Sequence, residues 1–204
     1  MTPTVGIERR LGVVLICLVA ACAARSAVPQ ASGTIDPRDL YPLVEGNAWS
    51  YDVDAGDGST TLAITRVDSV DGRIAEVRTG RAVIRYEVLS EGIRIPAEDV
   101  WLIRVPLREG ETWRARGGRT ARLVSTRAHA RTSAGDFDNC VEVLETGGEL
   151  ELEVQTVYCP GVGPVSVQST MRSTVSDRFV TVSARLRGYE ITRLPRPRPR
   201  PSTP

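Results

Sequence analysis

The chain has 204 residues, with 26 basic and 25 acidic side chains and a formal net charge of +1. Every basic residue is Arg, no Lys is present, and His129 is the only His. These counts exclude Schiff-base chemistry, a P-loop Lys and a metal site built on several His. The balanced charge and the aromatic content of 5% argue against a nucleic-acid-binding protein. We therefore expect no metal, no cofactor and no nucleic-acid partner.

Residues 1–21 predict an export signal. Arg9 and Arg10 precede an uncharged apolar run over residues 11–24. That run is shorter than the roughly 20 residues that a membrane-spanning helix needs. A basic start followed by a short apolar core is typical of a secretory signal peptide.

The end of this run, Leu-Val-Ala-Ala-Cys over residues 18–22, resembles the lipobox of bacterial lipoproteins. The resemblance implies cleavage between Ala21 and Cys22 and acylation of Cys22 on its sulfur and its new amino group. Two or more acyl chains anchor a protein stably, since each buried methylene contributes about 0.8 kcal/mol. Ala23 stands where lipoproteins of the inner membrane often carry Asp, which implies the periplasmic face of the outer membrane and leaves surface exposure open. The alternative is a simple signal peptide in which Cys22 has no role.

Two further segments have a composition of their own. Residues 22–40 hold the lipidated Cys followed by a stretch rich in Ala, Ser, Pro and Gly, which predicts a flexible tether. Residues 193–204 alternate Pro with Arg and then end in Pro, Ser and Thr, which favours an extended, disordered tail that cannot join a sheet. Contact of this tail with an anionic envelope component is the functional alternative.

Residues 41–192 predict one antiparallel β domain. Turn pairs with Gly separate runs of alternating polarity, and such pairs favour tight hairpins. The pairs are Asp57-Gly58, Asp71-Gly72, Glu91-Gly92, Gly117-Gly118 and Gly147-Gly148. The clearest strand covers residues 149–158, where Glu and apolar residues alternate. We expect an all-β fold of about ten strands joined by hairpins, forming a single curved antiparallel sheet or an open barrel, with a sandwich as the alternative.

Charge is segregated along this domain. Residues 104–131 hold eight Arg, and residues 136–153 hold seven acidic residues and no basic one. If these segments form neighbouring strands, opposite charges meet across the ladder. The alternative is a face of Arg residues that binds an anion.

One phrase occurs twice, at residues 42–49 (PLVEGNAW) and at residues 106–113 (PLREGETW). The copies share five of eight positions at an offset of 64 residues. The pattern predicts a loop that leads into a strand, with Trp49 and Trp113 packed in the core. A pair of aromatic clamps that contact a ligand is the alternative.

A second phrase, YCPGVG, covers residues 158–163. The two phrases together resemble a set of bacterial secreted and lipidated proteins, some of them described as TapB-like, with the patterns P-L-x-x-G-x-x-W and Y-x-P-G-V-G. The resemblance implies an antiparallel β domain akin to the LolA and LolB carriers, and it implies no catalytic residues.

Cys140 and Cys159 remain after processing, and two Cys in an oxidising periplasm usually form a disulfide. A tight hairpin centred on Gly147-Gly148 would place residue 140 opposite residue 155. Four residues of stagger amount to about 13 Å, which is beyond the reach of a disulfide. The bond therefore requires a longer loop, a bulge or a sheet crossing.

These features predict a membrane-anchored periplasmic lipoprotein with a non-catalytic binding or scaffold role. Its expected partners are the membrane, through the lipid anchor, and an envelope protein or an apolar ligand. One alternative is a carrier that holds a lipid or other apolar molecule against a concave sheet, as in LolA and LolB. A hydrolase that uses His129, or a carboxylate pair such as Asp136 and Asp138, is less favoured because no G-x-S-x-G motif accompanies the His.

Overall fold

The computed structural model describes residues 35–149, 151–173 and 178–192. These residues form one twelve-stranded antiparallel sheet with one short helix and one 3-10 turn, which confirms the predicted all-β class. The strand number is higher than the expected ten. In chain order the elements are α1 (Pro37–Leu40), β1 (Ala48–Asp54), β2 (Thr60–Asp71), β3 (Ile74–Thr79), β4 (Ala82–Leu89), β5 (Gly92–Ile95), β6 (Val100–Arg104), β7 (Thr112–Arg114), η1 (Arg116–Gly118), β8 (Arg119–Thr132), β9 (Gly135–Gly147), β10 (Glu153–Cys159), β11 (Gly163–Arg172) and β12 (Phe179–Glu190).

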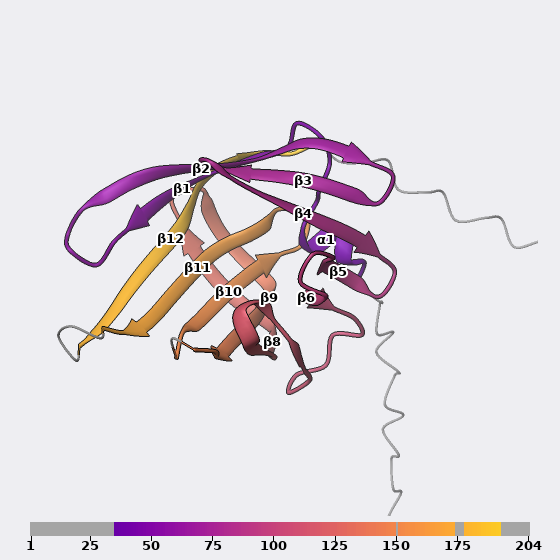
Figure 1. Cartoon of the computed structure of the whole chain (residues 1–204). Coiled ribbons are helices and arrows are strands. Elements are labelled where there is room, and N and C mark those ends of the chain that lie inside the picture. Colours follow the sequence, from indigo (N-terminus) through magenta and orange to yellow (C-terminus); the bar gives the residue numbers. More distant parts are fainter. Residues whose placement is uncertain (1–34, 150, 174–177, 193–204) are drawn as a thin grey trace, which may run out of the picture. The chain divides into compact units, whose positions relative to one another are not determined.

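The sheet consists of two meanders that meet at one junction. Strands β1 to β6 follow one another in space, strands β7 to β12 do the same, and β1 pairs with β12 between them (Figure 1). Strands β6 and β7 are the two ends of the sheet, and its curvature brings them close together. There the Trp113 Nε1–H donates to the Trp101 carbonyl oxygen at 3.1 Å. The result is a curved sheet that nearly closes on itself.

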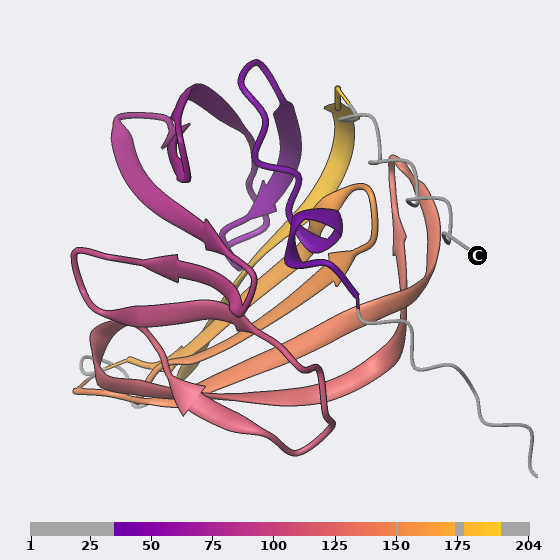
Figure 2. The same ribbon diagram turned by 90° about the vertical axis from the view of Figure 1, so that its right-hand side faces the viewer.

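The concave side of the sheet holds α1 and the residues after it (Figure 2). Leu40 is fully buried, and Tyr41 packs edge-on against Trp49 and Tyr86, with ring centroids 5.2 and 5.7 Å apart. Residues 22–40 were predicted to form a flexible tether, but Pro37–Leu40 are helical and belong to the core. The rest of that tether, the signal peptide with Ala21 and Cys22, and the tail at 193–204 lie outside the described residues.

Both copies of the repeated phrase fold into the same loop. The Gly46 N–H donates to the Val67 carbonyl at 3.0 Å, and the Gly110 N–H donates to the Leu123 carbonyl at 2.8 Å. The next two bonds of each loop also correspond: Asn47 N to Val44 O and Val67 N to Asn47 O in one copy, Glu111 N to Arg108 O and Leu123 N to Glu111 O in the other. Trp49 and Trp113 are both buried next to these loops, so the structural interpretation of the phrase fits the fold.

Cys140 and Cys159 form a disulfide with a Cα–Cα distance of 4.3 Å. The predicted strand over residues 149–158 is wrong at its start, because β9 ends at Gly147 and β10 begins only at Glu153. This longer connection moves the register so that Val141 lies opposite Tyr158. The two Cys are the next pair along the same ladder, which removes the difficulty of the tight hairpin.

Opposite charges meet across β8 and β9, as the segregated sequence predicted. Arg119 donates from Nε and Nη2 to Glu145 Oε2 at 3.0 and 2.9 Å, and both side chains are largely buried on the concave side. Arg131 pairs with Asp136 at 3.0 Å near the hairpin tip. Charge patterning therefore sets the register of this hairpin.

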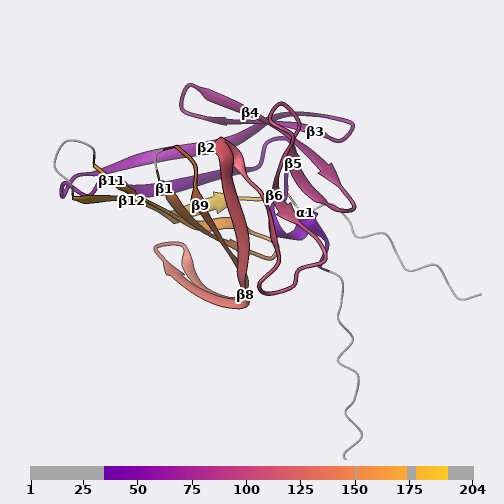
Figure 3. The same ribbon diagram turned by 60° about the horizontal axis from the view of Figure 1, so that its bottom comes forward.

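The far part of the β8–β9 hairpin, residues 126–139, leaves the plane of the sheet, and we call it the arm. Three register shifts bend the hairpin, two with the extra residue in β8 and one with it in β9, since each extra residue rotates and kinks a strand. Strand β8 therefore also contacts β11 and β12, across the convex face (Figure 3). The Ala134 N–H donates to the Leu186 carbonyl at 3.2 Å and attaches the arm tip to β12. Sequence alternation gave no sign of this bend.

Candidate ligand-binding site

A cavity of about 710 Å³ lies beside α1. Its walls come from α1 and the loop after it, the turn between β2 and β3, the end of β4, the turn between β10 and β11, and the two residues after β12. We call it the mouth cavity. Its volume falls within the range of about 300–1,000 Å³ that is usual for small-molecule sites.

Apolar side chains line the deeper part of the mouth cavity. They are Tyr41, Leu43, Val44, Val70, Ala75, Val88 and Ile191. Val70 reaches this wall because of a bulge in β2, which places it opposite Ala75 on the concave side. It nevertheless stays 38% exposed, since the cavity and not another side chain lies in front of it. The fold thus leaves inward-facing apolar surface uncovered at this end.

Charged side chains stand at the rim. Arg38 lies 3.8 Å from Asp36, and Arg73 lies 3.6 Å from Glu87, while both Arg side chains are more than half exposed. Two guanidinium groups therefore face solvent next to an apolar wall. Asp36 and Asp39 line the same rim, so it carries both signs of charge. This combination suits an amphipathic molecule that has an apolar body and a polar head.

The base of the cavity is fixed by the second phrase of the sequence. The Gly161 N–H donates to the Asp39 carbonyl at 2.6 Å, and the Trp49 Nε1–H donates to the Val162 carbonyl at 2.6 Å. A Cβ on Gly163 would lie 3.1 Å from Trp49 Nε1, so this position leaves little room for a side chain. The two phrases that carried the family resemblance are therefore in direct contact.

The phenol of Tyr41 in the cavity wall is uncharged. Burial raises its pKa well above the usual value, and the neighbouring Tyr86, Tyr51 and Tyr158 raise it further. The same causes keep the hydroxyls behind it neutral, because burial raises the pKa of Tyr86 to about 12. The part of the wall that Tyr41 forms thus presents no charge to a ligand at physiological pH.

The residues predicted from the sequence as candidate ligand contacts lie elsewhere. Trp49 and Trp113 are core residues and do not line the mouth cavity. His129 lies on the arm, half exposed, with its Nδ1 atom 2.8 Å from Asp138 Oδ1. Within the described ranges, no group of three or more His, Cys, Asp or Glu side chains is placed to hold a metal ion. No helix in the same part of the chain is long and apolar enough to cross a bilayer.

The cavity-lining residues were missed at the sequence level. Leu43 belongs to the repeated phrase and Tyr41 directly precedes it, but the sequence does not show that the first copy borders open space. Val70 follows a polar residue in β2, and only the bulge turns it inward. The one available signal was the position of Val70. Strict alternation along β2 would place this apolar residue on the side that faces solvent.

The comparisons with known proteins are sparse. No protein-family model matches the chain, and a search of curated proteins also found no match. A candidate exported protein with a YmcC-like fold from Bacteroides fragilis aligns with 72% of this chain and 97% of its own, at 15% identity and a TM-score of 0.44. A candidate lipoprotein from Parabacteroides distasonis aligns with 74% of this chain and 98% of its own, at 13% identity and a TM-score of 0.40.

Proposed function

We propose that this protein is a lipid-anchored envelope protein that binds an amphipathic molecule in the mouth cavity and performs no catalysis. The observation that carries the proposal is the cavity with apolar side chains in its wall and charged side chains of both signs at its rim. It favours the carrier alternative over a scaffold role. We do not propose a LolA-like site that extends over the whole concave face, because α1 and the aromatic residues around Tyr41 fill the middle of that face.

The position of the chain ends supports an anchored binding protein. Two residues near the ends of the described chain line the mouth cavity. They are Asp36, close to the first described residue, and Thr192, the last one. The Thr192 N–H donates to Asn47 Oδ1 at 2.7 Å, which fixes this end of the chain beside the first repeated loop. The chain therefore enters the described domain, and leaves it, beside the mouth cavity.

The ligand proposal is tested by photocrosslinking of the full chain in a bacterial host that lipidates it. Lipids with a photoactivatable acyl chain are supplied to the cells, and cross-linked peptides are identified by mass spectrometry. We expect labels on residues 41–44 and 70–75. Val70→Trp should narrow the cavity and reduce this labelling, since a large ring then occupies part of the space in front of the apolar wall. Val83→Trp is the matched control, because Val83 is an exposed Val on β4 outside the cavity. Labelling that is uniform, or equal in both variants, would contradict the proposal.

The anchor is tested separately with two Cys variants. Cys22→Ser should abolish incorporation of radiolabelled fatty acid, because it removes the acylated sulfur and disrupts the processing site. Cys17→Ser is the control, since Cys17 precedes the proposed cleavage site and is lost with the signal peptide. Continued acylation of the Cys22→Ser protein would show that the anchor assignment is wrong, and it would leave the cavity proposal standing.

A further inference from the structure

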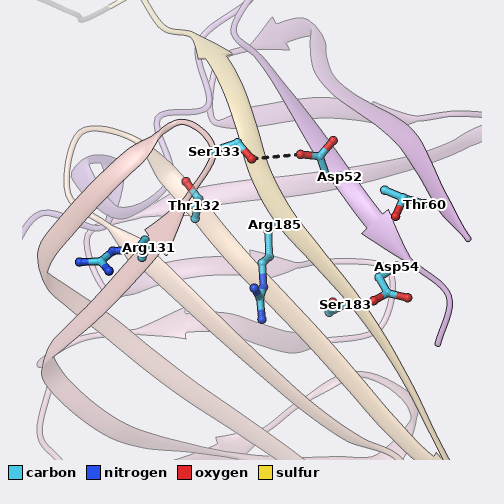
Figure 4. Close-up of a pocket in the computed structure, with 8 residues that line it drawn as sticks. All are labelled: Asp52, Asp54, Thr60, Arg131, Thr132, Ser133, Ser183 and Arg185. Atoms are coloured by element: carbon cyan, nitrogen blue, oxygen red, sulfur yellow. Dashed lines mark hydrogen bonds between the residues drawn. The ribbon is translucent and has the colours of Figure 1, made fainter. Parts of the chain in front are cut away.

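A second, smaller pocket of about 310 Å³ lies on the convex face, beneath the tip of the arm. Figure 4 shows that its roof comes from residues 131–133 and its floor from β1, β2 and β12. The Ser133 hydroxyl lies 3.2 Å from Asp52 Oδ2, and this bond holds the roof above the floor. The mouth cavity shares no residue with this pocket.

The floor is polar because of strand register. Tyr51 and Leu186 face the core, so their neighbours Asp52 and Arg185, which are paired across β1 and β12, face outward. Asp54 pairs with Ser183 in the same ladder. Asp54 and Arg185 are thus diagonal neighbours, a relation that separates the Cα atoms by about 7–8 Å.

Two of the charged groups already have partners. Asp52 accepts from Arg187 Nη1 at 3.0 Å as well as from Ser133. Arg131 donates from Nε to Asp136 at 3.0 Å, and its guanidinium points away from Arg185 (Figure 4). These side chains build the pocket and leave little capacity for a ligand.

Two other charged groups have no charged partner. The Arg185 guanidinium makes no hydrogen bond or ion pair with any described residue, although it projects into the pocket (Figure 4). Asp54 accepts the Gly56 N–H at 2.8 Å, but no cation in the described residues lies within ion-pair distance of it. Arg and Asp of opposite charge thus line one small pocket without meeting each other.

We infer that this pocket binds a small zwitterion such as an amino acid, with its carboxylate on Arg185 and its ammonium group on Asp54. The planar guanidinium fork matches a carboxylate in a bidentate arrangement. The hydroxyls of Ser183 and Thr60 stand beside the two charges and supply further hydrogen bonds. A doubly charged phosphate fits less well, because the Asp52 and Asp54 carboxylates repel it.

The pocket volume agrees with this ligand class. It corresponds to roughly ten water molecules at about 30 Å³ each, which is enough for an amino acid and too little for a lipid. The assignment is independent of the proposed function at the mouth cavity, so either can fail alone.

The test uses the full lipidated chain in lipid nanodiscs, titrated with alanine, acetate and inorganic phosphate. Dissociation constants come from saturation-transfer NMR. We expect alanine to bind at least about tenfold more tightly than acetate or phosphate, since a second charge-assisted contact is formed. Arg185→Gln should weaken alanine binding about tenfold or more, and Asp54→Asn should weaken it about fivefold while leaving acetate unchanged. Arg66→Gln is the matched control, because Arg66 is an exposed Arg on β2 that does not line the pocket.

Three results would overturn the inference. Absence of saturable alanine binding would do so, because the pocket would then be only a gap beneath the arm. Equal affinity for alanine, acetate and phosphate would show a general anion site. An Arg185→Gln protein that binds alanine like the Arg66→Gln control would show that binding occurs elsewhere. Arg185 is exposed and Asp54 lies at a strand end, so both variants should keep the fold, and circular dichroism spectra check this.

Discussion

The two halves of the sheet, β1–β6 and β7–β12, start alike and end differently. Each begins with a copy of the repeated phrase, and each copy makes the same three backbone hydrogen bonds before its Trp enters the first strand. The last strand of the second half, β12, pairs with β1 over seven residue pairs. The last strand of the first half, β6, forms no ladder with β7 within the described residues.

The difference follows from strand length. Strand β12 has twelve residues and β1 has seven, whereas β6 has five and β7 only three. A short strand offers few hydrogen bonds to a neighbour, and the Trp113 indole bridges the gap with a single bond to Trp101. The repeated phrase thus specifies the loop with which each half of the sheet begins. The length of the strands at each junction, β12 and β1 or β6 and β7, decides whether they form a ladder. The predictions below compare the two halves directly.

The largest difference is expected for the two Trp residues. Trp49→Ala should lower the free energy of unfolding by about 3–5 kcal/mol, since it opens a cavity beneath Tyr41 and leaves the Val162 carbonyl unpaired. Trp113→Ala should cost clearly less, because Trp113 stands at the open junction where neighbours can move inward. Urea unfolding of both variants measures this. Equal losses would show that the two junctions contribute equally to stability.

The disulfide stabilises only the second half. Cys140 and Cys159 are 19 residues apart, and a closed loop of that size contributes about 3 kcal/mol. Cys140→Ser combined with Cys159→Ser should therefore lower the free energy of unfolding by about that amount. Thermal unfolding with and without reductant checks it, and the double variant should be insensitive to reductant. A wild-type protein that is equally insensitive would argue against the bond.

The buried tyrosines should destabilise the protein at high pH. Burial raises the pKa of Tyr86 to about 12, so the folded state keeps a proton that the unfolded state loses above about pH 10. Stability is therefore unaffected below pH 10 and falls between pH 10 and 12, by up to about 1.4 kcal/mol per pH unit for each such group. Burial also raises the pKa of Tyr158 in the second half. Urea unfolding at several pH values should show a shallower fall in Tyr86→Phe and in Tyr158→Phe. An unchanged slope in either variant would show that its phenol is not protected in the folded state.

The smallest effect tests the equivalence of the two loops most directly. Gly46 and Gly110 have φ values of +86° and +88°, and a Cβ at either position would meet no atom within 4 Å. Gly46→Ala and Gly110→Ala should therefore each cost about 1–2 kcal/mol from backbone strain alone. Denaturant midpoints of the two variants should agree. A clear difference would mean that only one loop must keep this conformation.

Much of the fold was predictable from local signals. The Gly-containing turns fall between strands, as the pairs Asp57-Gly58 and Asp71-Gly72 illustrate, since Gly accepts the backbone angles that tight hairpins need. The opposed charges of residues 104–131 and 136–153 meet across β8 and β9, as expected for the case that these segments form neighbouring strands. The Trp residues of the repeated phrase were correctly assigned to the core. Each of these features depends on residues close together in the sequence.

The two pockets could not be predicted, because both depend on departures from regular pairing. A bulge in β2 turns Val70 into the mouth cavity, and three register shifts in the β8–β9 hairpin fold the arm over Arg185. The start of β10 was misplaced for a related reason, since alternation continues through Leu152 although the chain has already left the ladder. Alternating polarity reports which side a residue would face in a regular strand, and it contains no information about where the strand bends.

The ladder between β1 and β12 also bears on when this protein folds. It joins Ala48 to Glu190, near the two ends of the domain, so it can form only after nearly the whole chain has been synthesised. Bringing such distant segments together costs loop-closure entropy before any bond is formed, which slows the folding of sheets with this topology. The junction between the two meanders is thus the part of the sheet that must wait longest for its partner strand.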